Sequence, residues 1–375
     1  MMHTTPSRAP WIRRVLIVLG ATALVVPVTG AVAAMGRAAF GDAPPPPAVL
    51  VNVPIASAGA VTGGTGGATL VLHDSLFGRS GQLRVRLLSV GEAASTPGFA
   101  RTFGNDVLRE PAILALATAD DPDAFSFVTL HPWAEKRGSY VGSYLVGYWP
   151  GERGLVSRKY DNPAGFIEVN RRDLGVQLST HFQLGDFVTH DQPNVWPKYV
   201  VLREALLDKL ELVLAALEES GVPAGHARVL SGFRTPHHNA SVGEGAAYAS
   251  RHQYGDAADL IIDDNRDGRM DDLNGDGRVN ARDTDVILAA VERVERRWPE
   301  LVGGLGLYAA TGPSGPFAHI DVRGDRARWT NHGGATKSRT VTARRASTPG
   351  SGSSASRASG ACTASSEFAA LCAAR

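Results

Sequence analysis

The chain has 375 residues, of which 43% are hydrophobic, and this is enough to build two globular domains. Lys and Arg number 38 against 37 Asp and Glu, so the formal net charge is +1. This balance argues against a polyanionic partner and therefore against nucleic-acid binding.

The N-terminal segment, residues 1–36, has the charge order of an export signal. Its first basic residues are Arg8, Arg13 and Arg14. An uncharged run follows from 15 to 36, and Ala31-Val32-Ala33 offers a small-x-small cleavage site. The run is also long enough to span a bilayer, so an uncleaved signal anchor is the alternative to a cleaved signal peptide. Both predict that the remaining chain lies outside the cytoplasmic membrane, in the periplasm or cell envelope, and that only an uncleaved anchor contacts the membrane.

A linker and a β-rich region are expected next. Residues 37–48 include a run of consecutive prolines, which favours an extended chain and predicts a linker. From 49 to 168, alternating or β-branched runs are separated by glycine-rich turns. The clearest runs are 68–73, 82–88 and 139–149. They predict a β-rich N-terminal domain, in which we find no chemical motif.

The segment 170–335 mixes helical and strand patterns. Apolar residues recur three or four apart between Tyr199 and Ser220 and predict a helix, and a second helix is expected over 284–297. Short strands are expected at 227–230, 258–262 and 319–322. Helices and short strands thus alternate over this segment, which is typical of a compact domain and predicts a second domain over 170–335.

Beyond residue 340 the chain is rich in Ser, Ala, Gly and Thr, which predicts a disordered tail over 340–375. The 2 cysteines, Cys362 and Cys372, fall in this tail. In an exported protein they could close a small disulfide loop. They lie too far along the chain from the motifs described next to be convincing metal ligands.

Candidate metal chemistry is concentrated at His252, Asp259 and His319. Imidazole nitrogen and carboxylate oxygen are good zinc ligands, and a catalytic zinc usually takes three protein ligands plus a water. Arg234 lies upstream in Ser-Gly-Phe-Arg, so a cation accompanies the set. Two histidines and a carboxylate also suit iron(II), but a distal histidine should then follow after a long interval, whereas only His332 follows, and soon. The order of the residues therefore favours zinc.

An acidic insertion, residues 263–283, contains two overlapping D-x-N-x-D-G units. The second fits a 12-residue calcium loop, with ligand positions 1, 3, 5, 7 and 12 at Asp272, Asn274, Asp276, Arg278 (through its carbonyl) and Asp283. Gly277 supplies the tight turn at position 6, and Asp at position 12 resembles dockerin-type calcium loops. The first unit shares residues with the second, so we expect one good calcium site and at most a shared second. A solvated acidic turn is the alternative.

The three motifs, taken in order, resemble a known family. Ser-Arg-His-Gln-Tyr-Gly-Asp-Ala-Ala-Asp, 250–259, resembles the S-x-H-x-x-G-x-A-x-D signature of the zinc D-Ala-D-Ala carboxypeptidase/endopeptidase superfamily, which shares its fold with hedgehog signalling domains. The segments 231–236 and 317–322 resemble two further family motifs, the latter in its H-x-D variant. The resemblance covers about residues 170–325. It implies an α+β fold, with a hedgehog/DD-peptidase-like catalytic domain (a small antiparallel sheet with helices) after a β-rich region.

The resemblance also implies roles for individual residues. His252, Asp259 and His319 would ligate zinc, and Arg234 would contact the substrate carboxylate or the developing oxyanion. Zinc lowers the pKa of its water to about 7 and polarises a carbonyl, and arginine adds a fixed positive charge where negative charge develops.

The general base departs from the family pattern. Many members have Glu or His two or three residues before the last ligand, where this chain has Phe317 and Pro316. Asp321 follows His319 by two residues and therefore lies on the same face of a strand. It is a candidate for the base, for a residue that orients a ligand, or for a structural acid. His181 is a more distant candidate for the base.

The leading prediction is a zinc metallopeptidase that cleaves peptidoglycan cross-links or stem peptides as a D,D- or L,D-endopeptidase or carboxypeptidase. The alternative is a hedgehog-like metal-binding module that recognises the cell wall without turnover, because the upstream Glu or His is missing. The expected cofactors are Zn²⁺ and Ca²⁺, and the expected partner is peptidoglycan.

Overall fold

The computed structural model describes residues 74–96, 98–116, 125–154, 160–243, 246–309 and 312–331. All of them belong to one compact unit, 1–340. The expected export segment, the linker, the tail and both cysteines lie outside the described residues. Within the described chain, no helix has the length and apolar character needed to cross a membrane.

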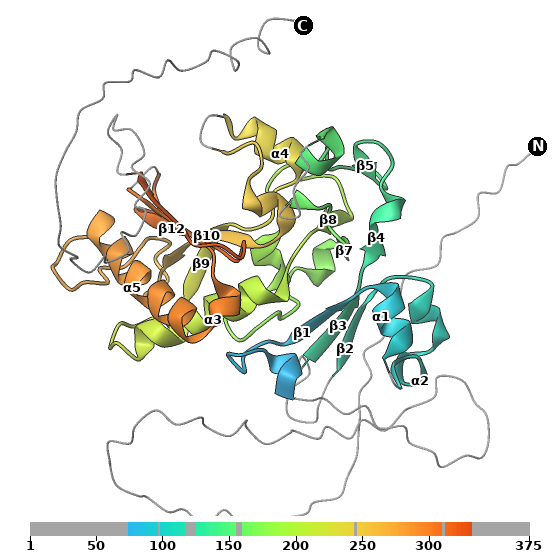
Figure 1. Cartoon of the computed structure of the whole chain (residues 1–375), viewed down its shortest axis with the longest axis horizontal. Helices are drawn as coiled ribbons and strands as arrows, with labels where there is room; N and C mark the ends of the chain where they lie inside the picture. Colours follow the sequence, from blue (N-terminus) through green and yellow to red (C-terminus); the bar gives the residue numbers. More distant parts are fainter. Residues whose placement is uncertain are drawn as a thin grey trace, which may run out of the picture. The chain divides into compact units, whose positions relative to one another are not determined.

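A three-stranded sheet forms the first part of the described chain. Its central strand β3 (Phe125–Thr129) pairs in parallel with β1 (Val85–Leu88) and antiparallel with β2 (Ile113–Leu116). Two short helices, α1 (Val90–Ser95) and α2 (Phe99–Phe103), lie beside it (Figure 1). Phenylalanine side chains form the core between them: Phe99, Phe103, Phe125 and Phe127. Strands were expected in this region, and these helices were not.

A second three-stranded sheet is antiparallel throughout, in the order β4 (His131–Pro132), β7 (Gly165–Val169), β8 (Lys198–Val200). Between the first two of these strands the chain forms a hairpin, β5 (Tyr140–Val141) and β6 (Tyr144–Leu145). The helix expected over 199–220 is wrong at its start, because Tyr199 and Val200 belong to strand β8 and pair with β7. The helix itself, α3, spans Glu204–Glu218.

One hydrophobic core joins residues from both sides of the domain boundary expected near 168. It extends from Leu83 to Val322. Trp149 shows how closely the two parts are connected, because its buried indole N–H donates to the backbone oxygen of Gln253 at 2.7 Å. The N-terminal region therefore packs directly onto the part of the chain that carries the metal motifs.

The main sheet has five strands. Their order is β13 (Ala327–Asn331), β11 (Gly304–Tyr308), β12 (Phe317–Asp321), β10 (Ala257–Ile262) and β9 (Ala227–Ser231). All neighbours are antiparallel except β11 and β13. The strands expected at 227–230, 258–262 and 319–322 are thus confirmed within a few residues, whereas β11 and β13 were not expected.

Two long helices lie together on one side of the main sheet (Figure 1). Helix α5 (Ala281–Arg297) packs against β11 and β12, and α3 packs against α5. α5 begins three residues earlier than expected, because Asn280 caps it and Asp283 completes the capping box. Buried leucines form the core-facing side of α3: Leu206, Leu207, Leu210, Leu214 and Leu217.

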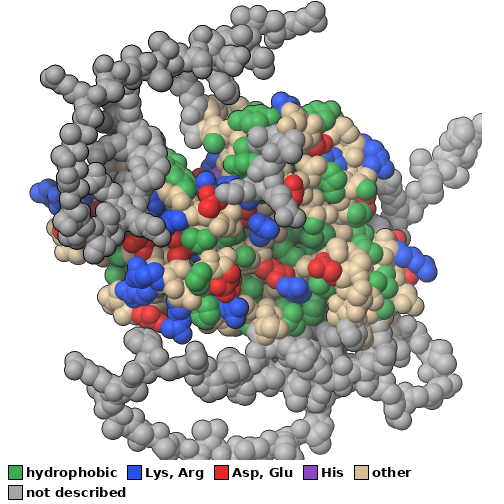
Figure 2. All heavy atoms as spheres, in the orientation of Figure 1, with side chains coloured by type: hydrophobic (Ala, Val, Ile, Leu, Met, Phe, Trp, Pro, Cys, Tyr) green, Lys and Arg blue, Asp and Glu red, His purple; other side chains and the backbone are tan. Residues whose placement is uncertain are grey.

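The remaining elements are short. One further α-helix, α4 (Pro236–Ser241), follows β9. The 3-10 turns are Asp74–Phe77, Asn105–Leu108, Trp133–Glu135, Pro150–Arg153, Arg171–Asp173, Leu184–Phe187, Arg251–Tyr254 and Pro299–Leu301. Acidic and basic side chains are interspersed on the face seen in Figure 2, as the small net charge suggests. The protein is a mixed α+β fold, with several small sheets and few helices.

Candidate metal centre

Three buried side chains converge on one point of the main sheet: His252, Asp259 and His319. His252 Nε2 lies 3.1 Å from Asp259 Oδ1 and 3.1 Å from His319 Nδ1, and the last two atoms are 2.9 Å apart. Tetrahedral geometry with metal–ligand distances of about 2.0–2.1 Å separates ligand atoms by about 3.3 Å. The triangle therefore has the size that a small metal ion requires, and the group could hold one. No other set of three His, Cys, Asp or Glu side chains among the described residues meets this criterion.

Strand register explains why these residues meet. Asp259 on β10 pairs with Ser231 on one side and with His319 on β12 on the other. His319 in turn pairs with Gly306 on β11, and Gly306 pairs with Trp329 on β13. Directly paired residues project to the same face of a sheet. One row across all the strands thus carries two of the candidate ligands and their immediate neighbours.

In each histidine ring, the nitrogen that points away from the centre donates a hydrogen bond. His252 Nδ1 donates to the carbonyl of Gly232 at 2.7 Å. His319 Nε2 donates to Asp321 Oδ2 at 3.1 Å. These bonds favour the tautomers that direct the lone pairs of His252 Nε2 and His319 Nδ1 to the centre, as in protein metal sites. The environment of both rings is therefore suited to metal binding.

The second oxygen of Asp259 is held by Arg234. The guanidinium bonds Asp259 Oδ2 and, through Nε, Ser231 Oγ at 2.7 Å. Burial would raise the pKa of Asp259, but the His252 and His319 rings outweigh it and lower that pKa well below its usual value. Burial would likewise lower the pKa of His319, yet its bonds to the two carboxylates raise it to about 9. Both shifts reflect the hydrogen bonds between these rings and the carboxylates, whereas burial lowers the pKa of His252.

Asp321 lies behind His319 and not at the centre of the triangle. Its carboxylate is fully buried and accepts from His319, from Gly304 N at 2.6 Å and from Arg323 Nε. Burial alone would raise the pKa of Asp321, but the His319 and Arg323 hydrogen bonds lower it well below its usual range. The expectation that Asp321 shares a face with His319 is confirmed. Its contacts fix the orientation of the His319 ring.

His181 is held elsewhere. Its backbone N–H and Nδ1 both bond to Glu211 on α3, at 2.8 and 2.7 Å. The group of candidate ligands does not include it. The contacts of His181 therefore connect its loop to α3.

Trp329 and Tyr308 border the centre, although no sequence motif points to the tryptophan. The Trp329 ring lies 5.2 Å from the His319 ring, and its indole N–H donates to Tyr308 Oη at 2.8 Å. Burial raises the pKa of Tyr308, so its hydroxyl keeps its proton. With its oxygen already accepting from Trp329, this hydroxyl can still donate. The pattern Gly-Leu-Gly-Leu-Tyr, 304–308, is the signal that could have placed it on a strand beside the ligands.

Replacing Gly306 with alanine is expected to destabilise the protein by about 1–3 kcal/mol, the usual cost of overpacking. A Cβ at Gly306 would lie 2.3 Å from Nε1 of Trp329, so the indole would have to leave its place over His319. Urea unfolding measures the change. Gly175→Ala is the control, since a Cβ there meets nothing within 4 Å, and its effect should stay within about 0.5 kcal/mol. Equal effects of the two changes would contradict the prediction.

The acidic insertion folds as two successive loops with the same hydrogen bonds. In the second loop Gly277 N donates to Asp272 Oδ2 at 2.7 Å, and Asp276 N donates to Asn274 Oδ1 at 2.9 Å. In the first loop the equivalent bonds are Gly268 N to Asp263 Oδ2, at 3.1 Å, and Asp267 N to Asn265 Oδ1, at 2.8 Å. Asp283 is fully buried and accepts from Leu273 N and Asn280 N. The side-chain oxygens are thus fixed by backbone N–H groups.

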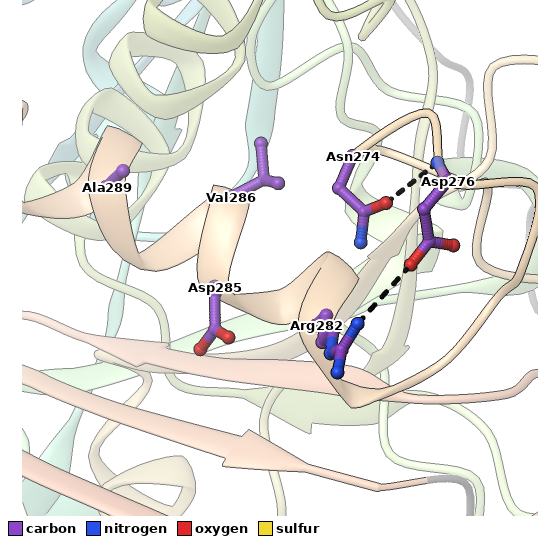
Figure 3. Close-up of a pocket in the computed structure, with 6 residues that line it drawn as sticks. All are labelled: Asn274, Asp276, Arg282, Asp285, Val286 and Ala289. Atoms are coloured by element: carbon purple, nitrogen blue, oxygen red, sulfur yellow. Dashed lines mark hydrogen bonds and ion pairs between the residues drawn. The ribbon is translucent and has the colours of Figure 1, made fainter.

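An open pocket lies between the second loop and α5 (Figure 3). Asn274 and Asp276 line it from the loop, and Arg282 and Asp285 line it from the helix. Arg282 lies 3.9 Å from Asp276 Oδ2. The carboxylates expected at loop positions 1, 5 and 12 do not gather as closely as the metal triad does.

No family model, curated protein or solved structure matches the chain. Function is therefore inferred from the residues and their geometry.

Proposed function

We propose that the protein is a zinc metallopeptidase that cleaves peptide bonds of peptidoglycan outside the cytoplasmic membrane. The observation that carries the proposal is the convergence of His252 Nε2, Asp259 Oδ1 and His319 Nδ1 within 3.1 Å of one another. Two histidines and one carboxylate are a ligand set of catalytic zinc sites, which keep a fourth position for water. The family resemblance of the three motifs supports the substrate class, and the export signal expected at 1–36 supports the compartment.

Zinc bound by these residues would supply an activated water and a Lewis acid for the scissile carbonyl. Arg234 is held by Asp259 and Ser231, so its positive charge stays beside the centre without reorganisation. The Tyr308 hydroxyl is a further donor on this face. Asp321 positions His319 through Nε2.

Mass spectrometry of muropeptides tests the proposal. Purified zinc-loaded protein should release fragments from sacculi, and His252→Ala should release none. With Asp321→Asn, a loss of zinc affinity of about 10–100-fold supports a positioning role. Loss of hydrolysis with zinc affinity retained assigns Asp321 the base role instead.

A binding module without turnover is the second candidate. It is favoured by one observation: no further Asp, Glu or His joins the three candidate ligands among the described residues. Such a module would sediment with sacculi and bind zinc but release no fragments. That result would replace the peptidase proposal.

We also propose that the second acidic loop binds calcium. Calcium added to zinc-loaded, calcium-free protein should raise the melting temperature, because a ligand at 100 times its Kd stabilises the fold by about 2.7 kcal/mol. Asp272→Ala should remove this response, because Asp272 occupies position 1 of the loop. Asp285→Ala is the control, since Asp285 lines the same pocket from α5 (Figure 3). An unchanged melting temperature of the unaltered protein would contradict calcium binding.

A further inference from the structure

A separate cavity of about 450 Å³ lies next to the segments that carry the metal site. Helix α4, which begins two residues after Arg234, forms one wall, and Gln253, which follows His252, forms another. The opposite wall comes from the β5–β6 hairpin and the turn after it. His237 N donates to the carbonyl of Val146 at 3.0 Å and holds these walls together. Figure 1 shows α4 and β5 close together.

Two exposed tyrosines lie at this cavity. Tyr148 and Tyr248 line it and are 43% and 60% exposed. Val242 lies between two lining residues of α4 and its following loop, and Tyr140 lies on the hairpin. Tyr140 and Val279, the remaining exposed large hydrophobic residues of the described part, do not line the cavity. Clustered exposed apolar groups around a hollow mark a binding site more often than a structural need.

The cavity walls carry positive charge. Among the described residues that line it, Arg153 is cationic and none is Asp or Glu. The Arg153 guanidinium lies 5.5 Å above the Tyr148 ring and forms no ion pair with any described residue. An exposed arginine without a carboxylate partner, held over an aromatic ring, is suited to bind an incoming carboxylate.

The position of Tyr248 is fixed by two buried amides. Gln253 Nε2 donates to the carbonyl of Tyr248 at 2.8 Å, and Asn239 Nδ2 donates to the carbonyl of Ala247 at 3.0 Å. Gln253 is itself fixed by Trp149, whose indole N–H donates to its backbone oxygen. The exposed tyrosine ring is therefore carried by an ordered backbone, which lowers the entropy cost of binding.

We propose that this cavity is a second subsite, which binds a carboxylate-bearing stretch of the peptide substrate. Arg153 donates to the carboxylate, and the Tyr248 ring packs against the aliphatic part of the peptide. The identity of the substrate rests on the proposed function. The existence of the subsite rests on the cavity, its exposed rings and its charge.

The test uses a peptidoglycan stem tetrapeptide with free carboxylates and the same peptide with every carboxylate converted to carboxamide. Calorimetry on the His252→Ala protein measures binding without turnover. We expect the free acid to bind about tenfold more tightly, as one charge-assisted hydrogen bond allows. Arg153→Gln in that background should abolish the preference, whereas Arg137→Gln, an exposed arginine outside the cavity, should keep it. In the same way, Tyr248→Ala should weaken binding of both peptides and Tyr140→Ala should not.

Kinetics separate the subsite from the catalytic centre. In the zinc-loaded protein with His252 intact, Arg153→Gln and Tyr248→Ala should raise KM for the free-acid peptide with kcat unchanged. Cleavage that is insensitive to both changes, or binding without preference for the free acid, overturns the subsite and leaves the peptidase proposal standing. Binding that depends on Arg153 without any cleavage overturns the peptidase proposal and leaves the subsite standing.

Discussion

Replacing His319 with alanine is expected to remove zinc from the protein and to abolish peptide hydrolysis. His319 Nδ1 is 2.9 Å from Asp259 Oδ1 and 3.1 Å from His252 Nε2, so its loss leaves two ligands and an open triangle. Disturbing a residue that merely orients a ligand costs about 10–100-fold in metal affinity, and loss of a ligand should cost more. Metal content after dialysis, measured by mass spectrometry, should fall from one zinc per chain to none.

His190→Ala is the matched control, because His190 is exposed and is not part of the metal triad. It should keep both zinc and activity. The same measurement distinguishes zinc from iron(II), for which two histidines and a carboxylate are also a suitable set. A His319→Ala protein that retains one zinc per chain would contradict the assignment of the centre.

The candidate ligands could be predicted from the sequence because each lies in a short motif whose chemistry is visible in its residue types. His319 and Asp321 are two apart on a strand, so their shared face followed from strand geometry alone. Trp329 could not be found in this way. It reaches His319 only because Gly306 lies between them in the sheet, and that depends on the pairing of β11 with both β12 and β13.

In the fold, too, local features could be predicted from the sequence, whereas long-range contacts could not. Asn280 and Asp283 form a local capping box, and the start of α5 is therefore determined by residues that are neighbours in the sequence. Strand β8 depends on β7, which lies about 30 residues earlier, and local periodicity favoured a helix at Tyr199 instead. Packing of Trp149 against Gln253 depends on an even longer separation. Local patterns predict elements, whereas pairing between distant segments decides where they end and what they contact.

Loss of Lys209 should destabilise the protein, because its ammonium group is buried between three elements. Its side chain is fully buried on α3, and Nζ donates to Glu295 Oε1 on α5 and to the backbone oxygen of Asp321 on β12, both at 2.8 Å. Burial lowers the pKa of Lys209, and the Glu295 carboxylate opposes this effect. The ammonium group therefore connects two helices to the strand that carries His319.

Lys209→Met should lower the free energy of unfolding by about 1–3 kcal/mol, because Glu295 and the Asp321 carbonyl lose a buried donor, while Arg328 and Gly303 N still donate to Glu295. Zinc content should stay at one per chain, since Lys209 contacts no candidate ligand side chain. Arg79→Met, which breaks the exposed pair with Glu300, should cost less than about 1 kcal/mol. Adding Glu295→Gln to Lys209→Met should cost less than the sum of the two single changes, because both single changes break the same Lys209–Glu295 pair, although Arg328 also loses its carboxylate partner. Strict additivity of the two changes in urea unfolding would show that the buried pair is not coupled, and the role assigned to Lys209 would fail.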